Sequence, residues 1–260
     1  MDDLRNKHIQ ITKSTLSPYK LKQINKNYGL LKSKQPLMKS KLNMRSYHSN
    51  SIKPIKATIP VLPNDFIFIF SAMDIETVRF NDKQVPIAIS IVSEEDKQLF
   101  ILRKPDTLDI VSVNKAVEEL WSDFFAYVLN NNHLFKTIFL HNLGSFDGYF
   151  IYKTLSILFE PNHISTIIDH LNKFIKIKLK LDHKEIIYLD SLRIFSVSLE
   201  DVCKNFNVKG KISKYNQDFN HFDLFDNEYL FNLFKQYSLQ DYVALFDALT
   251  EAQKLYISQI

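Results

Sequence analysis

Two carboxylates, Asp74 and Glu76, follow an apolar run in the stretch DFIFIFSAMDIET (residues 65–77). Side chains alternate across a strand, so both carboxylates would project from the same face. Carboxylates held that close repel one another unless water, a proton or a bridging cation relieves the repulsion. The pair is therefore either a solvated strand end or half of a metal site.

A further acid, Asp147, lies in the segment HNLGSFDGYF (residues 141–150), between a strand-like run and a helix-like run. Two of the four glycines in the chain, Gly144 and Gly148, flank Asp147, which indicates a loop with demanding backbone geometry. Capping of the following helix would account for this acid by itself. Metal ligation is the alternative.

The third candidate segment is QYSLQDYVALFDAL (residues 236–249). Tyr237 and Asp241 stand four residues apart and would share one face of a helix. Alone, this pair says almost nothing about function. Combined with the acids above, it makes four carboxylates and a tyrosine that could converge on one site from three separate elements.

Convergence of these groups would suit hydrolysis of a phosphodiester. Carboxylate oxygens are hard ligands that prefer Mg²⁺ or Mn²⁺. Two such ions, about 4 Å apart, can bind an attacking water and the leaving oxygen. Tyr237 would orient the water without acting as a base, because an ordinary phenol with a pKa of about 10 stays protonated. The single cysteine, Cys203, leaves no thiolate cluster for zinc and points to a reducing compartment.

The elements that must position these residues alternate between strand and helix patterns. The predicted strands cover residues 65–75, 85–93, 98–104, 136–142, 163–170, 173–182 and 185–195. The predicted helices cover residues 113–130, 146–159, 199–207 and 228–259, the last as one helix or a helix pair. The first three strands would form an antiparallel meander. This order predicts an α/β fold of the ribonuclease-H-like (DnaQ-like exonuclease) class, with a mixed sheet flanked by helices.

Charge divides the chain in two. Residues 1–60 hold 13 Lys and Arg against two acids, a net charge of +11, whereas the remaining 200 residues carry a net charge of −7. We predict a flexible basic arm and linker over residues 1–63 and a folded domain over residues 64–260. The arm could be a solvated tail, an electrostatic contact to nucleic acid or a mitochondrial import signal.

Amino-acid composition indicates the kind of genome that encodes the protein. Lysine greatly outnumbers arginine, and Asn, Ile, Phe and Tyr are abundant, as AT-rich codons would produce. We therefore expect an organellar genome or a linear plasmid as the source, with the mitochondrion as location. No apolar run reaches the roughly 18 residues of a membrane span, so no membrane contact is expected.

With these motifs in hand, the chain resembles the N-terminal 3′–5′ exonuclease (proofreading) domain of family B DNA polymerases, in particular the protein-primed enzymes of linear mitochondrial plasmids and small phages. DIET, HNLGSFDGYF and YSLQD are similar to the three exonuclease motifs of that family, in the same order. DSLRIF (residues 190–195) and VKGKI (residues 208–212) are similar to two further family segments. The resemblance covers roughly residues 64–255.

The resemblance implies a role for each matching residue. Tyr237 would position the water, and Lys209 would lie near the scissile phosphate. His141 and Phe150 are secondary candidates for holding DNA, although His141 is better explained as a structural histidine. The implied ligands of two metal ions are Asp74, Glu76, Asp147 and Asp241. The implied contacts to single-stranded DNA are Thr77, Asn142, Phe146, Ser191 and Leu192.

The resemblance stops just after the third motif, so we expect the polymerase half of the family to be absent. The expected function is hydrolysis of single-stranded DNA 3′ ends, with a separate polymerase portion or a terminal protein as a candidate partner. A catalytically inactive, nucleic-acid-binding remnant of such a polymerase is the alternative. A related nuclease that acts on RNA is a second alternative.

Overall fold

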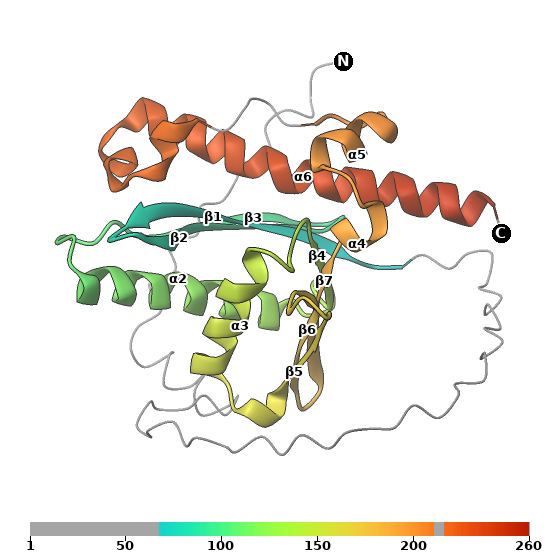
Figure 1. Ribbon diagram of the computed structural model, residues 1–260, viewed down its shortest axis with the longest axis horizontal. Helices are drawn as coiled ribbons and strands as arrows, with labels where there is room; N and C mark the ends of the chain where they lie inside the picture. The colour runs from blue at the N-terminus through green and yellow to red at the C-terminus, as the bar shows by residue number, and fades with distance from the viewer. Residues whose placement is uncertain (1–67, 211–215, 260) are drawn as a thin grey trace.

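The computed structural model describes residues 68–210 and 216–259. The predicted basic arm and linker over residues 1–63 lies outside the described residues. The described part forms one seven-stranded mixed sheet with helices on both faces (Figure 1). An α/β fold with a mixed sheet between helices is thus confirmed.

The sheet has the strand order β3-β2-β1-β4-β7-β6-β5. Its strands are β1 (Ser71–Phe80), β2 (Lys83–Val92), β3 (Lys97–Ile101), β4 (Thr137–Leu140), β5 (Ile164–Ile168), β6 (Phe174–Leu181) and β7 (Lys184–Asp190). The first three strands pair antiparallel, as predicted, and so do the last three. The short strand β4 joins the two groups, because it pairs parallel with both β1 and β7.

The turn between β1 and β2 follows from its two residues. Phe80 pairs with Lys83, which leaves a two-residue loop of Asn81 and Asp82. Both have positive φ, 48° and 58°, as a type I′ hairpin turn requires. Asn and Asp tolerate this left-handed conformation better than other side chains with a Cβ. The turn therefore fixes the register in which β1 and β2 pair from Phe80 back to Thr77.

The two longest helices cover opposite faces of β1–β3 (Figure 1). Helix α2 (Ile110–Asn130) begins at Asp109, whose carboxylate accepts hydrogen bonds from the backbone N–H groups of Val111 and Ser112. Helix α6 (Glu228–Ser258) is a single helix, which decides between the two predicted alternatives. The other helices are α3 (Asp147–Leu158), α4 (Leu192–Phe195) and α5 (Leu199–Asn205). Among the described residues, none of the helices combines the length and apolar character needed to cross a membrane.

Several predicted element boundaries are wrong, and two of them affect the site. The first strand begins at Ser71 and not at residue 65, because ladder pairing starts at Ser71 and Phe70 instead packs its ring edge-on against Phe139. The last predicted strand ends at Asp190, and the residues after it turn into helix α4. The chain turns directly after β7, and a hydrogen bond from the Leu192 N–H to the Asp190 carboxylate stabilises this turn.

Gly148 in the first turn of α3 provides a test of how tightly this helix packs. A Cβ at this position would lie 2.5 Å from the Leu143 carbonyl oxygen and 2.8 Å from Cδ2 of Phe174. We expect Gly148→Ala to lower the free energy of unfolding by about 1–3 kcal/mol, since neither neighbour can move freely. Chemical denaturation measures the change.

Gly210→Ala is the matched control, because among the described residues a Cβ there would meet only Cβ of Cys203, at an ordinary 3.5 Å. Equal stability of the two alanine variants would contradict the tight packing of α3 on β6.

Candidate metal-binding active site

A cleft of about 250 Å³ opens where β1, the loop between β4 and α3, and helix α6 meet. Its lining residues are Met73, Asp74, Ile75, Glu76, His141, Asn142, Phe146, Asp147, Leu199, Tyr237, Asp241, Tyr242 and Leu245. All four acids of the predicted metal site are among them, together with the predicted water-positioning tyrosine. The three separate sequence motifs therefore meet at one place.

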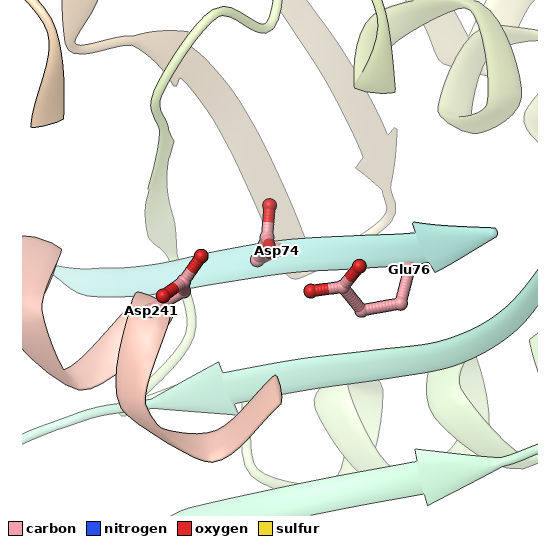
Figure 2. A group of neighbouring side chains, drawn as sticks. All are labelled: Asp74, Glu76 and Asp241. Atoms are coloured by element: carbon pink, nitrogen blue, oxygen red, sulfur yellow. The ribbon is translucent and has the colours of Figure 1, made fainter. Parts of the chain in front are cut away.

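Three carboxylates form the centre of this cleft. Asp74 and Glu76 extend from β1, and Asp241 faces them from α6 (Figure 2). One oxygen from each carboxylate lies within 4.8 Å of the other two. Three negative charges at this spacing repel strongly, and a hard divalent cation is the ligand class that such an oxygen set fits.

Asp147 lines the same cleft but lies outside the group of three. It is the first residue of α3 and only 3% exposed. Among the described residues, no hydrogen-bond donor reaches its buried Oδ1. Burial, first of all, and the negative charges of Asp74 and Asp190 raise its pKa well above the ordinary value. The site thus holds a fourth carboxylate whose ionised form a nearby cation would stabilise.

The capping interpretation of Asp147 is not what the structure shows. Phe146 occupies the N-cap position of α3, and no side chain caps this helix end. Asp147 is instead one of the residues that line the cleft.

Tyr237 stands next to Asp241 on the inner face of α6 and is 7% exposed. Burial is the largest cause that raises its pKa well above the usual value. The charges of Asp241 and Glu76, and a hydrogen bond with Asp241, raise it further. Tyr237 is therefore a neutral phenol in the cleft, able to hold a water by hydrogen bonding but not to act as a base.

Strand β1 has a β-bulge directly after Asp74 and Glu76. Glu76 pairs with Ala88, but Thr77 pairs with Pro86, so the register shifts by one residue of β2. Pro86 has no N–H to donate to the ladder, which is why a proline is tolerated at this bulge. Bulges increase the local twist of a strand, and this one lies at the edge of the cleft.

The predicted DNA contacts divide into two groups. Asn142 and Phe146 line the cleft, and Phe146 is 37% exposed. Thr77 is not part of the lining, and its hydroxyl donates a hydrogen bond to Oε1 of Gln84 at 2.9 Å. A contact from Thr77 to DNA stays a prediction.

Ser191 and Leu192 are not among the residues that line the cleft. Ser191 is fully buried, and its hydroxyl lies 3.1 Å from the Leu140 carbonyl oxygen and 3.1 Å from Nδ1 of His141. His141 also bonds through Nε2 to the carbonyl oxygen of Val197 at 3.0 Å. These contacts agree with a structural role for His141. They give Ser191 an internal role as well, and the DNA contacts of Ser191 and the half-buried Leu192 stay predictions.

Lys209 is exposed and does not line the cleft. Its backbone carbonyl accepts a hydrogen bond of 3.4 Å from Nε2 of Gln240, the residue before Asp241. Residues 211–215, which complete the VKGKI segment, lie outside the described residues. The predicted contact of Lys209 with the scissile phosphate stays a prediction.

Asp190 is a site residue that sequence reasoning missed. Its buried carboxylate accepts hydrogen bonds of 3.0 Å from the backbone N–H groups of Asn142, Gly144 and Leu192. These bonds hold the loop between β4 and α3 in place, including Asn142 with its positive φ of 81°. The available signal was an acid at the start of the DSLRIF segment, in which only Ser191 and Leu192 were given roles.

The mixed sheet flanked by helices defines the class of the fold, which is ribonuclease-H-like α/β. Phi29 DNA polymerase complexed with single-stranded DNA has a similar structure, with 16% identity and a TM-score of 0.50 over 72% of this chain and 31% of that one. The same polymerase complexed with primer-template DNA gives the same identity and TM-score, with 32% of that chain covered.

Sequence comparisons name the family more narrowly. The family described as DNA polymerase type B, organellar and viral, matches residues 130–258. A probable DNA polymerase from Ascobolus immersus is 29% identical over 152 residues, which are 56% of this chain and 11% of that protein. The chain is therefore a relative of the organellar and viral type B DNA polymerases, as the motifs predicted. It spans about a tenth of the Ascobolus protein and about a third of phi29 polymerase.

Thermal unfolding with and without metal tests the carboxylate centre. We expect Mg²⁺ or Mn²⁺ at about 100 times Kd to stabilise the protein by about 2.7 kcal/mol relative to EDTA. In Asp74→Asn/Glu76→Gln this response should vanish, while the stability in EDTA should rise because two repelling charges are gone.

The control for that experiment is Glu94→Gln/Glu95→Gln, which neutralises two exposed acids in the turn between β2 and β3. It should keep the full response to metal. A metal response that persists in Asp74→Asn/Glu76→Gln would contradict the site.

Asp190 can be tested with two substitutions of graded effect. Asp190→Ala leaves three backbone N–H groups without their acceptor, so we expect a loss of about 3 kcal/mol in the free energy of unfolding. Asp190→Asn keeps an oxygen for Asn142 and Leu192 and should lose about 1–2 kcal/mol. Urea denaturation measures both, and an Asp190→Ala variant as stable as the wild type would contradict the role of Asp190 in holding the loop.

Proposed function

We propose that this chain is a 3′–5′ exonuclease that removes nucleotides from single-stranded DNA ends, as the proofreading part of a type B DNA polymerase. The observation that carries the proposal is the meeting of Asp74, Glu76 and Asp241 within 4.8 Å, with Asp147 and Tyr237 in the same cleft. DNA as the substrate is supported by the relationship to DNA polymerases and by the phi29 complexes with single-stranded and primer-template DNA.

Four carboxylates would hold two divalent ions, Mg²⁺ or Mn²⁺: Asp74, Glu76, Asp147 and Asp241. When bound, the ions would supply Lewis-acid activation of a water and stabilisation of the negative charge that develops on the phosphate. The high pKa of buried Asp147 fits this role, since a cation would offset the cost of its ionised form.

The other cleft residues would bind and orient the reactants. Tyr237 stays neutral and would hold the attacking water in line with the phosphorus by a hydrogen bond. Phe146 presents a partly exposed ring to the cleft, on which a base of any sequence could stack. Lys209, from the segment beside Gln240, would approach the scissile phosphate as a positive charge.

The setting of the reaction is also part of the proposal. The composition typical of an AT-rich genome and the organellar and viral family support a linear plasmid or mitochondrial DNA as the replicated molecule. A polymerase portion, or a terminal protein on the DNA end, is the partner class that such replication would supply.

Digestion of a 5′-labelled single strand in the presence of Mg²⁺ tests the activity. We expect products that shorten one nucleotide at a time from the 3′ end, and no shortening of a strand whose 3′ end is blocked. Asp74→Ala/Glu76→Ala removes two of the proposed ligands and should lower the rate by at least about 10³-fold. Glu94→Ala/Glu95→Ala removes the same charge from an exposed turn and should keep the wild-type rate.

Activity that survives Asp74→Ala/Glu76→Ala would refute the assignment. Binding of the strand by the wild-type protein without any metal-dependent cleavage would instead support the alternative of an inactive remnant. In that case the affinity should fall steeply with salt, because phosphate contacts dominate such binding.

A further inference from the structure

An aromatic strip leads out of the cleft along helix α3. Phe146 lines the cleft, and Tyr149 and Tyr152 follow it at intervals of three residues. Residues three apart lie next to each other on successive turns of a helix. The exposed fractions of the three side chains are 37%, 51% and 42%. Helix geometry carries the strip about 9 Å beyond the cleft, at a rise of about 1.5 Å per residue.

Tyr149 and Tyr152 both pack against the ring of Phe174. Their ring centroids lie 5.4 Å and 5.5 Å from that of Phe174, the first residue of β6. Phe174 is only 7% exposed and also packs against Gly148, where no side chain intervenes. One part of each tyrosine ring therefore rests on a fixed support, while the rest faces solvent.

Positive charge accompanies the strip. Lys153 on α3 and Lys173 before β6 are both exposed. Cβ of Lys173 lies within 3.2 Å of where a Cβ on Gly144 would be, which places this lysine beside the loop of the cleft. Aromatic rings interleaved with lysines fit a single-stranded nucleic acid, whose bases stack and whose phosphates attract cations.

We propose that Tyr149 and Tyr152, supported by Phe174, extend the cleft into a platform on which the bases upstream of the 3′-terminal nucleotides stack. The inference rests on the proposed function, because it assigns the path of the same single-stranded DNA. Stacking accepts any base, so the platform would add affinity without sequence preference. It would make binding depend on strand length beyond the few nucleotides that the cleft holds.

A length series of 5′-fluorescent oligo(dT), measured by anisotropy in EDTA, tests the platform without cleavage. We expect wild-type protein to bind the 12-mer at least about tenfold more tightly than the 3-mer. In Tyr149→Leu/Tyr152→Leu, the 12-mer should bind about tenfold more weakly than in the wild type, with 3-mer binding unchanged. Leucine still covers Phe174 but has no ring face, so the fold is retained. Tyr149→Phe/Tyr152→Phe keeps the rings and should bind like the wild type.

Tyr256→Leu is the matched control. This tyrosine is 56% exposed and lies 15 residues beyond Asp241 on α6, about 22 Å away along the helix. It should leave both affinities unchanged. Equal melting temperatures of all variants confirm that only the surface has changed.

Wild-type affinity for the 12-mer in Tyr149→Leu/Tyr152→Leu would overturn the platform. Loss of binding to both the 3-mer and the 12-mer would also overturn the platform. It would show that the tyrosines support the cleft and do not extend the binding surface beyond it. A failure of the proposed function is separate: the wild-type protein would then fail to shorten DNA in Mg²⁺, whatever the length dependence of binding in EDTA.

Discussion

The crowding of three carboxylates within 4.8 Å is the constraint on which the rest of the site depends. Like charges at that spacing push α6 away from β1, so the packing of this helix must oppose the repulsion. Ala72 of β1 and Tyr242 and Leu245 of α6, all buried, belong to one hydrophobic cluster directly beside the acids. Apolar burial next to the repulsion thus holds the acids in place, and a divalent cation would relieve what remains.

A second support comes from the other half of the sheet. Strand β4 is only four residues long, yet it links β1 to β7 and ends at the loop that carries Asn142 and Asp147. Asp190 at the end of β7 fixes that loop through three backbone hydrogen bonds. The cleft is therefore assembled from both halves of the sheet, and a change in either half is expected to reach the carboxylates.

The side chains of the cleft are compatible with the proposed role of cutting single-stranded DNA of any sequence. The cleft is lined by carboxylates, which could bind cations, and by the ring of Phe146, on which a base could stack, and neither kind of group reads the identity of a base. The proposed removal of mismatched 3′ ends would require such tolerance of sequence. The relationship to type B DNA polymerases and the geometry of the cleft therefore support the same proposal from independent directions.

Much of this protein followed from local pattern. Alternation in β1, helical spacing in α6 and the glycines around Asp147 each indicated an element and a face, because they depend only on backbone geometry. Tertiary structure decided what local pattern could not. It brought Asp241 to Asp74 across 167 positions of sequence, ended a predicted strand at Asp190, and gave that missed carboxylate three backbone partners. It also buried Ser191 and packed the rings of Tyr149 and Tyr152 against Phe174. Such contacts join residues distant in the chain, and no spacing along the sequence specifies them.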